Sequence, residues 1–207
     1  MKYTLERLKM DYDMGMFQTP DNFVFFWGHH EKGKGITKAC FSQWYPCHFV
    51  VEGIRYNCAE QYMMAEKARV FGDEITRKKI LLTTEPDVIK QLGREVENFN
   101  AEKWDALSGE VVIRGNLAKF SQNEELLEVL LATEDKVLVE ASPYDKIWGI
   151  GMKQSEAEKE HPHIWKGTNK LGFALMEVRD MLIQEKNQML AAAPTHSNEE
   201  LTASSSR

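Results

Sequence analysis

The stretch NCAEQYMMAEKAR, residues 57–69, predicts a helix whose charged residues are distributed in an unusual way. At about 100° per residue, Glu60, Met64, Lys67 and Phe71 fall on one stripe of that helix. A carboxylate and an amine therefore share a face with two large apolar side chains. Such a face normally packs against the protein core, so the two charged groups need a specific reason to lie there.

Two explanations fit this pattern. Asn57 and Glu60 have the spacing of a capping box, in which Asn57 is the N-cap and the Glu60 side chain reaches back to the cap. Lys67 would then be a lysine whose stem covers apolar surface while its amine reaches water. Alternatively, Glu60 and Lys67 line a pocket, since two helical turns separate them by about 10 Å. Glu66 and Arg69 fall on the opposite side, where we expect solvent.

Composition indicates a globular protein and excludes several classes of function. The chain has 207 residues, 43% of them hydrophobic, and a net charge of −6. A protein that binds nucleic acid non-specifically normally needs a basic stripe, and none is visible. No apolar run approaches a membrane span of about 20 residues. Three cysteines and no signal peptide favour a reducing compartment, so we expect a cytoplasmic protein, with the nucleus as the alternative.

The pattern of elements predicts a predominantly helical α+β fold with a few short strands. We expect residues 1–20 to be an N-terminal segment, residues 21–185 one compact domain, and residues 186–207 a disordered tail. The expected strands and hairpin cover residues 24–28, 49–57 and 136–141. The expected helices cover residues 57–69, 73–80, 86–96, 104–120, 124–132 and 169–185.

The segment SPYDKIWGIG, residues 142–151, carries a second group of candidate residues. Asp145 and Trp148 stand in a turn, and Gly149 allows the backbone to bend or to approach a ligand closely. The group is either a structural Asx turn with a packed tryptophan or a carboxylate beside a stacking ring. The cysteines and histidines lack zinc-ligand spacing, so we expect no metal site.

Together, the short motifs of this chain resemble the YbiA-like, or NADAR, family. The resemblance covers about residues 23–182 and rests on these segments in order: FSQW (41–44), AEQYMMAEK (59–67), GR (93–94), Trp104, LAKF (117–120), LLAT and LVE (130–140), DKIWGIG (145–151) and GTNKLGFALMEVR (167–179). It implies a single, mostly helical α+β domain that acts as an N-glycosidase without a metal or redox cofactor. Known members hydrolyse ribosylamino-pyrimidine phosphates of riboflavin biosynthesis or remove ADP-ribose from guanine bases.

The resemblance also assigns roles to individual residues. It implies Glu60, Lys67 and Asp145 as catalytic residues. The implied substrate-binding residues are Trp104, Trp148, Gly149, Phe41, Ser42, Arg94 and Asn169. The chain departs from the family pattern at Gln43 and Ala59, and it carries extra charged residues between Gly151 and Gly167.

These residues suggest a hypothesis for the chemistry. Glu60 would act as acid or base, and Asp145 would stabilise positive charge on the sugar. Lys67, with its pKa lowered by partial burial, would attack C1 of the opened ribosylamine to form a Schiff base. Trp104 and Trp148 would enclose the base. We expect ADP-ribosylated guanine as substrate, with the riboflavin intermediates as the alternative, and a non-catalytic module that binds ADP-ribose as a competing class.

Overall fold

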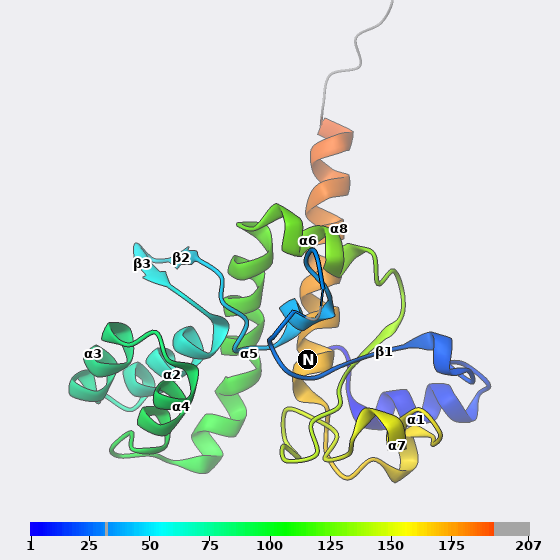
Figure 1. Ribbon diagram of the computed structural model, residues 1–207, viewed down its shortest axis with the longest axis horizontal. Coiled ribbons are helices and arrows are strands. Elements are labelled where there is room, and N and C mark those ends of the chain that lie inside the picture. The colour runs from blue at the N-terminus through cyan, green and yellow to red at the C-terminus, as the bar shows by residue number, and fades with distance from the viewer. Residues whose placement is uncertain (32, 193–207) are drawn as a thin grey trace, which may run out of the picture.

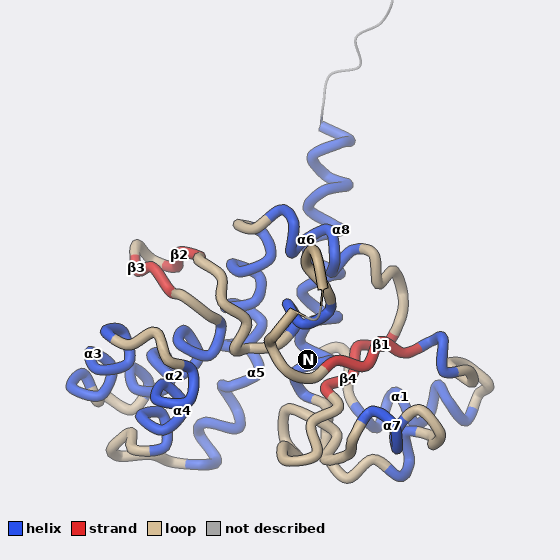
Figure 2. Tube along the Cα trace, in the orientation of Figure 1, coloured by secondary structure: helices blue, strands red, loops and turns tan. Residues whose placement is uncertain are grey.

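The computed structural model describes residues 1–31 and 33–192 and confirms a single, predominantly helical α+β domain. Two long helices, α5 and α8, pack together at the centre (Figure 1). Helices α2, α3 and α4 lie with a β-hairpin on one side of α5, and the β1–β4 pair lies with α1 and α7 on the other side (Figures 1 and 2). The helices are α1 (Leu5–Asp13), α2 (Ala59–Val70), α3 (Glu74–Leu82), α4 (Pro86–Arg94), α5 (Ala101–Ser121), α6 (Glu124–Leu131), α7 (Gln154–Ala157) and α8 (Lys170–Ala192).

Helix boundaries follow from capping residues in the sequence. The Asp73 carboxylate accepts a hydrogen bond from the Thr76 N–H at 2.9 Å and begins α3. The Asn100 side chain accepts one from the Lys103 N–H at 2.8 Å and begins α5. Each cap satisfies an N–H group that has no partner inside its helix.

The strands form two separate two-stranded sheets. β2 (Phe49–Val51) and β3 (Ile54–Tyr56) make the expected hairpin. Glu52 and Gly53 both have positive φ, 50° and 77°, as a tight two-residue hairpin turn requires. β1 (Phe23–Phe26) and β4 (Val137–Glu140) are parallel, and Phe26 is the register partner of Glu140. The second sheet therefore joins segments that are far apart in the sequence.

Close backbone approaches hold these elements against one another. A Cβ on Gly115 of α5 would lie 2.4 Å from Cδ1 of Tyr62 in α2. A Cβ on Gly172 of α8 would lie 2.0 Å from the Leu138 carbonyl oxygen of β4. These two glycines let α5 approach α2, and α8 approach β4, more closely than any other residue would permit.

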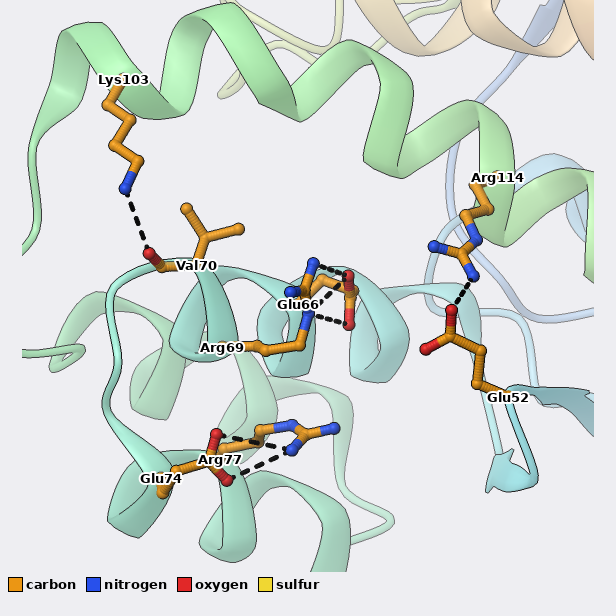
Figure 3. Close-up of polar contacts among 8 residues, drawn as sticks. All are labelled: Glu52, Glu66, Arg69, Val70, Glu74, Arg77, Lys103 and Arg114. Atoms are coloured by element: carbon orange, nitrogen blue, oxygen red, sulfur yellow. Dashed lines mark hydrogen bonds and ion pairs between the residues drawn. The ribbon is translucent and has the colours of Figure 1, made fainter.

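Polar contacts add to this packing (Figure 3). The Arg114 guanidinium of α5 pairs with the Glu52 carboxylate of the hairpin turn at 2.5 Å. The Lys103 amine of α5 donates to the Val70 carbonyl at the end of α2, at 3.3 Å. Both contacts are exposed, so we attribute to them alignment of the elements rather than a large share of the stability.

Both ends of the chain differ from the expected organisation. Thr4 caps α1 within a segment that shows no strong sequence pattern, and Leu5 and Leu8 of α1 are buried. Helix α8 extends to Ala192, past the point near residue 186 where the sequence suggests that a tail begins. The remainder of the expected tail, residues 193–207, lies outside the described residues. None of the described helices is long and apolar enough to cross a membrane.

Candidate active site

The start of α2 is built differently from the expected capping box. The N-cap is Cys58 rather than Asn57, and the Asn57 N–H donates instead to the Gln61 side-chain oxygen at 2.9 Å. The Glu60 N–H donates to the Gln43 carbonyl at 2.8 Å. The capping-box explanation for Glu60 is therefore wrong, because Gln61 takes that role and leaves the Glu60 carboxylate free for another.

The Glu60 side chain is buried, with 7% of its surface exposed. Within the described residues, no hydrogen bond to its carboxylate is formed. Burial raises the pKa of Glu60 to about 7, while Lys90, Arg94 and Lys67 oppose the rise and Asp145 adds to it. A carboxyl group poised near neutrality can exchange a proton with a substrate at physiological pH.

Lys67 lies two turns along the same helix. Its amine donates to the Gly93 carbonyl at 2.6 Å and lies 4.1 Å from the centre of the Phe99 ring. Partial burial lowers the pKa of Lys67, and the Glu60 carboxylate opposes that shift. A larger fraction of the amine is therefore neutral than for an exposed lysine, which favours nucleophilic attack.

On the opposite side of α2, Arg69 is exposed as expected, but Glu66 is not. Glu66 is buried, with 6% of its surface exposed, and Arg69 binds both of its carboxylate oxygens (Figure 3). Helical periodicity places this pair correctly on a common face, and α5 packs against α2 and passes alongside the turn that carries Glu66 (Figure 3). The ion pair compensates for burial of the carboxylate.

Asp145 forms the turn that follows β4. Its Oδ1 accepts hydrogen bonds from the Ile147 N–H at 2.9 Å and the Trp148 N–H at 2.8 Å. Its own N–H donates to the Ser142 hydroxyl at 3.2 Å. The structural Asx turn is thus present, and the charge of Asp145 also lies close enough to affect the pKa of Glu60. The two explanations for this residue are compatible.

Two residues near Glu60 are absent from the sequence-based candidates. Glu140 ends β4, and its Oε2 is buried without a hydrogen-bond partner in the described residues. Burial raises the pKa of Glu140 to about 8, with further contributions from Asp145 and Glu60. Lys90 of α4 is the cation that most strongly opposes the rise at Glu60. Two sequence features could have pointed to these residues. Glu140 is a carboxylate at the end of the apolar run VLVE, and Lys90 is a lysine one helical turn before Arg94.

Several residues that the sequence predicts to contact the ligand are instead buried and contact other parts of the protein. Phe41 is completely buried, 0% exposed, and packs on Phe26 with ring centroids 5.5 Å apart. Asn169 is also 0% exposed, and its side chain bonds the β4 backbone at Leu138 and Glu140. Both side chains therefore have a structural role inside the protein, and their contact with a ligand stays a prediction.

Gly149 is buried as well, and Ser42 is half-buried. The Ser42 hydroxyl accepts a hydrogen bond from the Trp44 N–H at 3.2 Å. A Cβ on Gly149 would lie 2.9 Å from the Glu140 carbonyl oxygen, which explains the glycine by backbone packing. The altered family position Gln43 also faces inward, since its side-chain oxygen accepts from Asn116 at 2.8 Å.

Trp104, Trp148 and Arg94 remain available at the surface of the site. Trp148 is half-buried beside Asp145, and Arg94 is exposed at the end of α4. Trp104 lies near the C-terminal end of α2, which carries Lys67, and its ring centroid is 6.5 Å from that of Phe71. An open hollow of about 570 Å³ adjoins Phe71 but includes neither Glu60, Lys67 nor Asp145, so we place the chemistry at the carboxylates rather than in that hollow.

Comparison with known proteins assigns the fold and the site to a family. A family model described as the NADAR domain matches residues 25–183. The chain belongs to the NADAR family. The NADAR domain thus includes every candidate residue, from Phe41 to Asn169.

Named relatives of this NADAR chain include N-glycosidases. The chain is 45% identical over 165 residues to N-glycosidase R617 of Acanthamoeba polyphaga mimivirus, covering 77% of this chain and 96% of that protein. It is 34% identical over 136 residues to N-glycosidase YbiA of Escherichia coli, covering 66% of this chain and 76% of that protein. The NMR structure of E. coli YbiA matches with a TM-score of 0.67 and 29% identity over 85% of this chain and 92% of the other.

The arrangement favours acid–base and nucleophilic chemistry. The site contains two carboxyl groups with raised pKa values, Glu60 and Glu140, and a lysine with a lowered pKa, Lys67. Cations flank these groups. Among residues 1–31 and 33–192, no three histidine, cysteine, aspartate or glutamate side chains are arranged to hold a metal ion.

Proposed function

We propose that this NADAR domain is a hydrolase that cleaves the bond between ribose C1 and a nitrogen atom. The observation that carries this proposal is the buried Glu60 carboxyl group, which does not cap α2 and whose pKa is raised to about 7. Cleavage of an N-glycosidic bond requires proton transfer and stabilisation of positive charge at C1. The N-glycosidase names of the two relatives support the same reaction class.

Individual residues have distinct proposed roles. Glu60 acts as acid or base, and the Asp145 carboxylate stabilises the developing positive charge or holds sugar hydroxyls. Lys67 attacks C1 of the ring-opened sugar and forms a Schiff base, which water then hydrolyses. Trp148 and Trp104 contact the base.

For the substrate, we propose ADP-ribose attached to a guanine base. Lys90 and Arg94 stand one turn apart on α4, both near enough to influence Glu60, and supply positive charge for a diphosphate. Trp27 and Tyr144 form an exposed aromatic pair, 57% and 84% exposed, with ring centroids 6.1 Å apart. These exposed rings and Trp148 could stack on two different bases. ADP-ribosylated guanine contains two bases, adenine and guanine, whereas a riboflavin intermediate contains only one.

Product analysis tests this proposal. The full chain is incubated separately with an oligonucleotide carrying ADP-ribosylated guanine and with a ribosylamino-pyrimidine phosphate. Release of free ADP-ribose from the first supports the proposed substrate, and release of ribose phosphate from the second alone replaces it with the riboflavin intermediate. Binding without release in both experiments indicates a binding module. Glu60→Gln is the inactive comparison, and Glu125→Gln, at an exposed position on α6, is the control.

A further inference from the structure

The Glu140 side chain is an unexplained acidic group inside the domain. It ends a strand whose preceding residues, Val137 to Val139, are all 0% exposed. Its Oε2 is buried without a hydrogen-bond partner among the described residues. A carboxylate in such a position is costly unless it is protonated or meets a ligand.

The backbone around Glu140 is held on both sides. Its N–H donates to the Asn169 side-chain oxygen at 3.0 Å, and its carbonyl accepts from the Ile150 N–H at 2.9 Å. Phe26 pairs with it across the parallel ladder. The side chain is therefore presented from a rigid strand end, as precise positioning of a reactive group requires.

Glu140 lies in the same carboxylate group as Glu60. The Glu60 charge raises the pKa of Glu140, and the Asp145 charge raises the pKa of both residues. Lys90 of α4 opposes the rise in both. Glu60 comes from α2, Asp145 from the turn after β4, and Glu140 from the strand itself. Neighbouring buried carboxyl groups cannot all ionise easily, so such a group retains a proton near neutral pH.

We propose that Glu140 is the catalytic acid that protonates the leaving nitrogen, a role that rests on the proposed function. The Lys67 amine adds to C1 of the ring-opened sugar. The bond from C1 to the leaving nitrogen then breaks, its electron pair remains on that nitrogen, and the Glu140 carboxyl proton moves to it, which leaves the Lys67 Schiff base. Water adds to C1 of the Schiff base and gives one proton to the Glu60 carboxylate; its other proton moves to the Lys67 nitrogen as the bond from C1 to Lys67 breaks. Transfer of the proton from Glu60 to Glu140 restores both groups, and the net reaction consumes one water molecule.

The environments of the two carboxyl groups support this division. Burial raises the pKa of both groups, and the Asp145 and Glu60 charges raise the pKa of Glu140 further. Glu140, whose Oε2 also has no hydrogen-bond partner among the described residues, is therefore the group that holds the proton. Paired carboxyl groups with separated pKa values are the arrangement by which glycosidases assign acid and base roles.

Carboxyl titration and kinetics of the full chain test this assignment. In a ¹³C-glutamate-labelled chain, the signal lost in Glu140→Gln should titrate near pH 8, and it should move to lower pH in Glu60→Gln. The Glu140→Gln variant should retain its fold and lose about 10²- to 10⁴-fold in kcat/KM. It should also lose the alkaline limb of the wild-type pH profile, which a merely structural role would leave in place.

Each contrary result has a separate meaning. If the wild-type chain releases product and Glu140→Gln keeps its rate and pH profile, the donor role alone is overturned. A Glu140 signal that titrates below pH 6, or one unaffected by Glu60→Gln, also overturns it. If the wild-type chain cleaves neither substrate, the proposed function fails and the donor role fails with it. Glu125→Gln controls for the loss of one negative charge.

Discussion

The side chain of Asn169 binds the β4 backbone at two points, accepting from the Glu140 N–H at 3.0 Å and donating to the Leu138 carbonyl at 2.9 Å. Asn169 itself has a φ of 54°, in the left-handed region that asparagine tolerates better than most residues. This residue immediately precedes α8, so it joins the start of that helix to the strand end that presents Glu140.

Asn169→Ala should therefore destabilise the domain by about 2–4 kcal/mol, because a buried N–H and a buried carbonyl lose their partners. Urea denaturation measures the change. Asn169→Gly loses the same hydrogen bonds but accepts the positive φ, so it should be less destabilised than Asn169→Ala by about 1 kcal/mol. Equal stability of both variants with the wild type would contradict the role of this contact.

The pH dependence of stability should reveal the buried Glu60. Its pKa is raised from 4.5 to about 7 in the folded state, so the folded state binds a proton more tightly than the unfolded state. The contribution of Glu60 to the free energy of unfolding should therefore fall as pH rises from about 4.5 to about 7 and stay low above that range. Glu60→Gln should remove this contribution and gain on the order of 3 kcal/mol relative to the wild type at pH 8. Glu140, whose pKa is raised to about 8, should keep a slope of the same sign in the variant.

Chemical denaturation at several pH values between 5 and 9 measures that difference. Glu125→Gln, which removes an exposed carboxylate, should follow the wild-type curve. A Glu60→Gln curve parallel to the wild-type curve would show that Glu60 is not buried as an isolated carboxyl group.

Lys67 should form a covalent adduct with the opened sugar. Borohydride added during turnover should reduce the Schiff base and leave a stable mass increase on the peptide that contains Lys67. Lys67→Arg should keep the charge and abolish trapping. Lys103→Arg is the matched control, because this exposed lysine is nearby and its amine donates to the Val70 carbonyl. Full turnover without any trapped protein would leave Lys67 with an electrostatic role only.

Two glycines of α5 should respond oppositely to alanine. Gly115→Ala places a methyl group 2.4 Å from the Tyr62 ring and should cost about 1–3 kcal/mol through overpacking. Gly109→Ala meets nothing closer than 3.5 Å and should stabilise the helix by up to about 1 kcal/mol. Thermal unfolding of both variants measures this contrast, and a similar change in both would show that the α2–α5 contact is looser than described.

Local sequence signals predicted most elements correctly, because caps, turns and periodicity act over a few residues. Asp73 begins the helix expected from residue 73, and the hairpin expected over residues 49–57 turns at Glu52-Gly53. Helix α5 begins at Ala101 rather than at the expected Trp104, because Asn100 caps it. Helix α1 gave no strong pattern, since only Leu5 and Leu8 of that helix are buried. The parallel pairing of β1 with β4 was not predictable either, because no local signal links strands so distant in the chain.

The sequence alone determined that Glu60 and Lys67 share one face of a helix, since helical geometry depends only on their spacing. It could not decide between a cap and a pocket, and the position of Glu140 at the end of the run VLVE did not by itself place that residue beside Glu60. Tertiary structure decided both questions: Gln61 took the capping role, and folding brought the end of β4 to the start of α2. The physical reason is that a carboxyl group's pKa depends on burial and on neighbouring charges, and only the folded chain supplies these.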